Sequence, residues 1–129
     1  MTRKEIVPVP LPPSTVPLNR AVRFGNLLFV SGTVGGDVLT DQWGDIREQV
    51  RRSLETIQVA LESAGTGLEH VLSVTTHLKL VEDFAAYNEV YRSFFPTDFP
   101  TRTTVRADLM LPAILVEISC IAGIPDATR

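Results

Sequence analysis

The chain has a single cysteine, Cys120, and only two histidines among its 129 residues. One cysteine cannot form a disulfide within the chain, and it excludes a zinc site built from several thiolates. Because Cys120 lies in the apolar run VEISCIAGI, we expect a small core residue rather than a reactive thiol. His70 and His77 are seven residues apart, and neither has a second ligand at the spacing that metal sites use, so we predict no metal site.

The chain is also short of basic charge and of long apolar runs. Twelve Lys and Arg residues against fifteen Asp and Glu give a net charge of -3, which argues against binding to nucleic acid through its phosphates. No run of eighteen apolar residues and no signal-peptide pattern occur, so we expect a cytoplasmic protein without a membrane span.

Aromatic residues make up only 7% of the chain, although its mean hydropathy is positive at +0.14. The apolar content is therefore mostly Val, Leu, Ile and Ala. This is more aliphatic surface than a small monomer readily buries.

The length predicts a single domain over residues 1–129, and five of the nine prolines fall within the first seventeen residues. Such a segment favours an extended path, so we expect a surface arm at about 1–17 with at most a short edge strand around Ile6–Val7. Strands at 21–24 and 27–31 follow, joined by a Gly25–Asn26 turn that suits a hairpin. The glycine-rich segment 31–36 lacks the motif of a phosphate or dinucleotide loop, and we interpret it as a flexible turn.

Two amphipathic helices are expected next. The first has Asp45 as its N-cap, Gly65 as its stop and an apolar stripe of Ile46, Val50, Leu54, Ile57, Leu61 and Ala64. The second precedes Pro96 and has an inner stripe of Phe84, Tyr87, Tyr91 and Phe94. Strands are expected at 71–80, 103–109 and 115–122, and Leu72, Val74, Thr76, Leu78 and Leu80 share one face of the first of them.

The resulting order is β-β-α-β-α-β-β, which predicts an α+β fold with both helices on one face of the sheet. The last strand is apolar on both faces, with Val116, Ile118 and Cys120 on one and Leu115 and Ile121 on the other. A sheet that is apolar on both faces but has helices on only one needs a partner for the other. Self-association supplies such a partner.

Arg102 and Glu117 are the residues whose surroundings raise a chemical question. Arg102 begins a strand of β-branched residues, so it is either a surface residue at a strand end or a guanidinium aimed into a cleft for a carboxylate. Glu117 has apolar neighbours on both sides, which means that its carboxylate is ion-paired, faces a solvated pocket or has a raised pKa. A structural ion pair and a water-activating acid/base both fit this position.

The segments GNLLFVSG, DFAAYNEVYRSFF and FPTRTTVRADLMLPAILVEISCIA together resemble the RidA/YjgF family, formerly called the L-PSP family. The likeness extends from about Val16 to Ala122. It implies a chorismate-mutase-like fold that assembles as a homotrimer, in which three sheets form a central barrel and active sites lie between subunits. The implied activity is a cofactor-free hydrolysis of 2-imino or enamine acids, such as 2-aminoacrylate, to 2-keto acids and ammonia.

The resemblance also implies roles for individual residues. Arg102 matches the arginine that binds the substrate carboxylate, and Glu117 the acid that orients or activates the attacking water. Asn88 and Phe84 match a pocket asparagine and an apolar wall. Gly32, after Ser31, matches a position where the backbone approaches the ligand.

Two positions depart from the family pattern. Leu18 replaces a tyrosine whose hydroxyl reaches the pocket, and Thr104 replaces a frequent cysteine. A more apolar pocket favours a bulkier imine or an aminated intermediate such as an aminomuconate-like acid. Two other functions stay open: a trimer that binds a small carboxylate without turnover, and the ribonuclease or translation-inhibitor activity described for some members, which the acidic balance disfavours.

Overall fold

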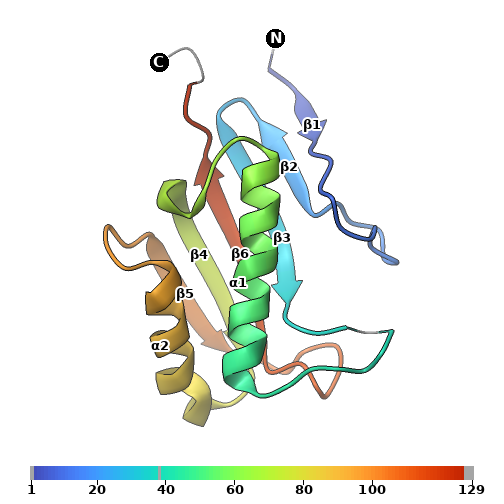
Figure 1. Cartoon of the computed structure of the whole chain (residues 1–129), viewed down its shortest axis with the longest axis vertical. Coiled ribbons are helices and arrows are strands. Elements are labelled where there is room, and N and C mark those ends of the chain that lie inside the picture. Colours follow the sequence, from blue (N-terminus) through green and yellow to red (C-terminus); the bar gives the residue numbers. More distant parts are fainter. Residues whose placement is uncertain (1, 38, 127–129) are drawn as a thin grey trace.

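A computed structural model describes residues 2–37 and 39–126, in which two helices cover one face of a six-stranded sheet (Figure 1). The strands are β1 (Lys4–Ile6), β2 (Ala21–Phe24), β3 (Leu27–Val34), β4 (Val71–Leu78), β5 (Thr101–Arg106) and β6 (Val116–Gly123). The helices are α1 (Ile46–Ser63) and α2 (Phe84–Phe94), and short 3-10 turns at Leu68–His70 and Val81–Asp83 precede β4 and α2.

The strand order in the sheet is β1-β2-β3-β6-β4-β5. All neighbours are antiparallel except β4 and β5, which run parallel and are linked through α2. The sheet is therefore mixed, and the predicted α+β fold with both helices on one face of the sheet is confirmed (Figure 1). The edge strand expected in the proline-rich arm is present as β1, at 4–6 rather than at 6–7.

The first helix follows its sequence signals closely. The Asp45 carboxylate accepts a hydrogen bond of 2.9 Å from the Glu48 backbone N–H, as an N-cap does. Its apolar stripe is buried against the sheet, where Val50, Leu54, Ile57 and Leu61 are at most 1% exposed. The stripe residues at the two ends, Ile46 and Ala64, are only partly buried.

The second helix buries Tyr87 and Tyr91 as predicted, whereas its two ends differ from the prediction. Phe84 is 44% exposed at the start of the helix, and Phe95 just after its end is buried while Phe94 is only partly so. Phe95 is the C-cap, where the backbone leaves the helical conformation and can turn the ring inward.

The prediction of a flexible turn at 31–36 is wrong for its first four residues. Ser31, Gly32, Thr33 and Val34 continue β3, and the pairing with β6 shifts register between Val30 and Thr33. Such a bulge accommodates an extra residue without ending the strand, so a glycine at this position did not mark a turn.

The predicted face of Leu72 is wrong for a related reason. Pairing between β4 and β6 shifts register between Val71 and Ser73, so Val71 is buried and Leu72 is 51% exposed. From Val74 onward the predicted alternation holds. Strand β4 ends at Leu78 instead of Leu80, and β5 begins at Thr101 and ends at Arg106, earlier than the predicted 103–109.

The sheet has one covered and one open face. Val30, Val74, Ile118 and Cys120 belong to the core beneath the helices. The open face carries the side chains that alternate with them, and several are exposed apolar residues: Phe24, Leu27, Phe29 and Leu72.

Candidate active site in two halves

Arg102 is the second residue of β5 and lies on the helix-covered face of the sheet. It is paired with Val74 of the core, and its guanidinium carbon lies 5.1 Å from the ring centroid of Tyr87 and 4.8 Å from that of Tyr91. Phe84 adds a third ring at 5.8 Å. Attraction between a cation and aromatic ring faces holds the guanidinium here without using up its N–H donors.

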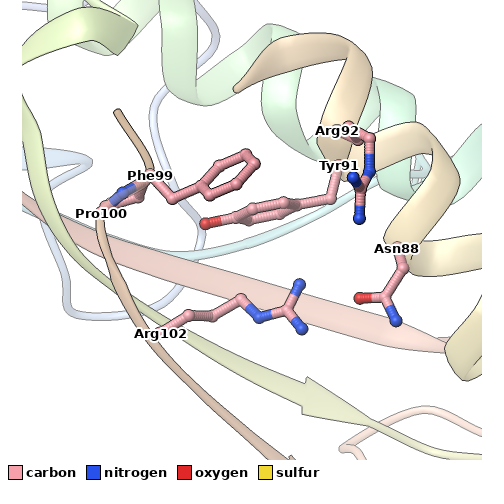
Figure 2. Close-up of a pocket in the computed structure, with 6 residues that line it drawn as sticks. All are labelled: Asn88, Tyr91, Arg92, Phe99, Pro100 and Arg102. Carbon is pink, nitrogen blue, oxygen red and sulfur yellow. The ribbon is translucent and has the colours of Figure 1, made fainter. Parts of the chain in front are cut away.

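A cavity of about 250 Å³ opens beside Arg102. We call it the arginine pocket; its lining residues are Asn88, Tyr91, Arg92, Phe99, Pro100 and Arg102. Figure 2 shows the Arg102 guanidinium and the Asn88 amide extending into the same space, with the Phe99 and Tyr91 rings along one side. This combination of fixed N–H donors and apolar walls suits a small carboxylic acid.

Three polar atoms around Arg102 are buried without a hydrogen-bond partner among the described residues: Tyr91 Oη, Asn88 Oδ1 and Thr104 Oγ1. Burial, helped by the neighbouring Tyr87 and opposed by Arg102, raises the pKa of Tyr91 to about 12. The Tyr91 phenol therefore stays protonated at neutral pH and can donate a hydrogen bond.

Glu117 lies on the open face, in the second position of β6. It pairs with His77 of β4 on one side and with Val34 of β3 on the other. A Cβ added at Gly32 would come within 2.8 Å of Glu117 Oε2, so the carboxylate occupies the space that the missing side chain leaves. The β3 bulge therefore positions Gly32 for this carboxylate.

Ser31 precedes Gly32 in β3 and is bonded to the chain segment that follows Leu18. The Ser31 hydroxyl donates a 2.6 Å hydrogen bond to the backbone carbonyl of Asn19. The backbone N–H of Ser31 donates to the carbonyl of Arg20. These bonds join the segment containing Leu18, which is 45% exposed, to the bulged part of β3. We refer to Ser31, Gly32 and Glu117 as the glutamate patch.

The predicted site residues thus form two separate groups within one chain. Arg102, Asn88, Phe84 and Thr104 lie with α2 on the covered face. Glu117, Gly32 and Ser31 belong to the open face, and β4 separates the Glu117 strand from the Arg102 strand. A ligand held in the arginine pocket of one chain does not reach the glutamate patch of that same chain.

Sequence reasoning missed several residues of the arginine pocket. The sequence places Tyr91 in the inner stripe of the second helix and assigns no role to Arg92, Phe99 or Pro100. A signal was present, because Asn88, Tyr91 and Arg92 recur at helical spacing on the side of α2 nearest to Arg102.

Among residues 2–37 and 39–126, no group of three or more His, Cys, Asp or Glu residues is arranged to hold a metal ion. In the same part of the chain, no helix combines the length and the apolar character that crossing a membrane requires.

Comparison with known proteins places this geometry in a family. The family profile described as Endoribonuclease L-PSP matches residues 11–124. The chain belongs to the RidA/YjgF family. A structure from Mycobacterium tuberculosis, described as a member of the highly conserved YjgF/YER057c/UK114 family, is 29% identical and superposes with a TM-score of 0.80. It covers 95% of this chain and 100% of its own.

Two relatives within the RidA/YjgF family carry names of enzymes. A protein of Dermatophagoides farinae named 2-iminobutanoate/2-iminopropanoate deaminase is 32% identical, with 96% of this chain and 99% of the relative covered. The 3-aminoacrylate deaminase RutC of Acinetobacter baylyi is 34% identical, with coverage of 96% and 100%. A Schizosaccharomyces pombe relative, 39% identical with 83% of this chain and 87% of the relative covered, is named as mitochondrial. Family membership therefore does not fix the compartment expected from the sequence.

Proposed function

We propose that the protein hydrolyses 2-imino acids, with their enamine tautomers, to 2-keto acids and ammonia, without a cofactor. The observation that carries the proposal is the Arg102 guanidinium, held over three aromatic rings beside a small cavity and the Asn88 amide. The names of the two relatives, both imine or enamine deaminases, give the reaction class.

Arg102 binds the substrate carboxylate through paired N–H donors, which fixes the neighbouring imine carbon in the pocket. Asn88 contributes amide hydrogen-bonding groups to the pocket. Phe84 adds an exposed apolar ring whose centroid lies 5.8 Å from the Arg102 guanidinium carbon. Thr104 Oγ1 and Tyr91 Oη, both buried without a partner among the described residues, supply further polar contacts next to Arg102.

Glu117 acts as the acid/base on water. The water oxygen forms a bond to the imine carbon while Glu117 takes a proton from the water and delivers it to the imine nitrogen, which gives a carbinolamine. Glu117 then takes the hydroxyl proton and passes it to the amino nitrogen as the C–N bond breaks. Ammonia leaves, the hydroxyl oxygen becomes the keto oxygen, and Glu117 is again a carboxylate.

Binding of the carboxylate by Arg102 and proton transfer by Glu117 require two copies of the chain, because these two residues lie on opposite faces of one sheet. We propose a homotrimer in which the arginine pocket of one subunit meets the glutamate patch of the next. The exposed apolar residues of the open face support this assembly, since an uncovered patch of this kind marks an interface.

Leu18 bears on which imine is preferred. It is exposed in the isolated chain and its segment is bonded to Ser31 of the glutamate patch. An aliphatic side chain in place of a hydroxyl favours an imine with a bulkier side chain than that of 2-iminopropanoate, and Thr104 keeps a small hydroxyl on the other side of the site.

The decisive experiment couples the protein to an amino-acid oxidase that generates imino acids and follows release of keto acid. We expect Arg102→Ala to lower kcat/KM by about 100-fold, the loss of a charge-assisted bidentate contact. Arg102→Lys keeps the charge without the two-pronged geometry and recovers only part of the rate. Arg51→Ala, on α1 and paired with Glu55, is the matched control and retains full activity.

Equal rates for wild type and Arg102→Ala across several imino acids contradict the proposal. Binding of 2-ketobutyrate with no hydrolysis of any imine indicates a carboxylate-binding module instead. RNA cleavage by nuclease-free protein that disappears in Arg102→Ala indicates the ribonuclease alternative.

A further inference from the structure

The arginine pocket contains a second guanidinium, that of Arg92. It directly follows Tyr91 in α2, and its guanidinium carbon lies 6.0 Å from the centroid of the Phe99 ring. Figure 2 shows its side chain descending from α2 beside Tyr91 towards the space that Arg102 and Asn88 also enter. Arg92 therefore contributes positive charge to a cavity that already contains Arg102.

Neither of these two cations has a counter-ion among the described residues. The arginines of α1 do: Arg47, Arg51 and Arg52 are each within 3.3 Å of a glutamate carboxylate, on Glu89, Glu55 and Glu48. Glu89, the glutamate of α2 nearest to Arg92 in sequence, is thus already paired with Arg47 of α1. None of the described residues that line the arginine pocket is acidic.

Two positive charges around one small cavity repel each other, and an anion that contacts both relieves that repulsion. A substrate with a single carboxylate neutralises only one of them. We propose that the preferred substrate is an imino acid that carries a second carboxylate on its side chain. Arg102 binds the carboxylate next to the imine carbon, and Arg92 binds the distal one.

The walls of the pocket fit this assignment. Phe99 and Pro100 offer apolar surface for the methylene groups that separate the two carboxylates. The Phe99 ring also fixes the position of the Arg92 guanidinium, in the way that Tyr87 and Tyr91 fix that of Arg102. A volume of about 250 Å³ is below the roughly 300–1,000 Å³ of drug-sized ligand sites, so the ligand is small.

This inference rests on the proposed hydrolysis and specifies its substrate class, with Arg92 as a specificity-determining residue. The test compares the imines of glutamate and norvaline, which have the same number of carbon atoms and differ in the distal carboxylate. Each is generated by an oxidase, and kcat/KM is measured for both. We expect wild type to prefer the glutamate imine.

Arg92→Gln should lower kcat/KM for the glutamate imine by about 10- to 100-fold, the loss of one contact between charged groups. The norvaline imine should change by less than about twofold, because it makes no contact with that guanidinium. Arg92→Lys should recover part of the preference, and Arg51→Gln should behave as wild type. Equal losses for both imines in Arg92→Gln, or a wild-type preference for the norvaline imine, overturn the inference.

Binding of the corresponding keto acids separates this inference from the proposed hydrolysis. Calorimetric titration with 2-oxoglutarate and 2-oxopentanoate requires no turnover. If neither imine is hydrolysed but 2-oxoglutarate binds more tightly in an Arg92-dependent manner, the hydrolysis fails and the ligand class stands. If both imines are hydrolysed and the two keto acids bind equally, the hydrolysis stands and the dicarboxylate preference fails.

Discussion

Arg102 is held by ring faces, whereas the arginines of α1 are held by carboxylates. A guanidinium paired with a carboxylate has its donors occupied, but one that rests on Phe84, Tyr87 and Tyr91 keeps them available. Each such contact contributes about 0.5–2 kcal/mol. The aromatic residues of α2 therefore orient the Arg102 guanidinium and leave its N–H donors available to bind a ligand.

Cys120 is expected to be inert in the folded protein. It is 5% exposed, and burial raises the pKa of its thiol to about 12. The thiolate is the reactive form, so a maleimide should react with the native protein only as the pH rises towards that value. At pH 8 we expect no labelling by mass spectrometry within an hour, and complete labelling in strong denaturant. Ser63→Cys, at the exposed end of α1, should react at once under native conditions. Rapid native labelling of Cys120 would show that the core opens readily.

Glu117 and Arg102 were each recognisable in the sequence, but their separation onto two faces was not. The apolar neighbours of Glu117 and the β-branched neighbours of Arg102 are local signals. Which face each occupies depends on the pairing of β6 and β5 with β4, and that register is set by contacts distant in sequence. The family resemblance implied a site between subunits without showing which residues lie in each half.

The bulge in β3 supplies a specific test of the glutamate patch. A Cβ at Gly32 would meet the Glu117 carboxylate at 2.8 Å. Gly32→Ala should therefore displace that carboxylate and lower kcat by about tenfold or more, part of the roughly 10²–10⁴-fold that a positioned acid/base contributes. The melting temperature should change little, because the obstacle is the end of a side chain.

Gly65→Ala is the control variant for Gly32→Ala. Gly65 has a φ of 81° and open space at its Cβ position, so the substitution strains the backbone by about 1 kcal/mol without reaching the site. A Gly32→Ala variant with full activity would argue against the role of Glu117.

Gln49 fixes α1 to the loop that leads into β6. Its side chain is fully buried, donates to the carbonyls of Gly44 and Ala113, and accepts a 2.9 Å hydrogen bond from the Leu115 N–H. Gln49→Leu leaves these backbone groups unpaired, so unfolding in urea should show a loss of about 2–4 kcal/mol. Gln58→Leu, which loses one hydrogen bond to Glu62, is the control and should change stability by less than about 0.5 kcal/mol. Equal stability of both variants would contradict this account.

Regular periodicity was sufficient to predict the helices and most strands, and it failed at register shifts. The apolar residues of α1 recur at regular helical spacing from Val50 to Leu61, so this local spacing determines which face of the helix is buried. At Gly32 and Leu72 the partner strand decides instead. The position of a bulge is a property of two strands together, which explains why a single segment did not indicate it.

The open face of the sheet leaves apolar side chains exposed in the single chain, and the aliphatic ones among them, Leu27 and Leu72, account for part of the aliphatic excess of the composition. Phe24, Leu27 and Phe29 are 41–50% exposed in the single chain. We expect a trimer by light scattering, and we expect Phe29→Glu to dissociate it and abolish hydrolysis, because burying an unpaired carboxylate costs more than the interface gains. Val81→Glu, which introduces the same charge at the exposed turn before α2, should stay trimeric. A wild-type monomer with full activity would contradict the shared site.

The placement of Arg102 and Glu117 on opposite faces has a genetic consequence. If each site takes its arginine from one subunit and its glutamate from another, two inactive variants can complement each other and restore activity in a mixed trimer. Arg102→Ala and Glu117→Gln proteins should each be inactive alone. Unfolded together in equal amounts and refolded, they should regain about a quarter of the wild-type activity, since random assembly leaves that share of sites with both residues. The double variant Arg102→Ala/Glu117→Gln, refolded with an equal amount of wild type, should also leave about a quarter of the sites with both residues, below the half that remains if the two proteins do not mix subunits.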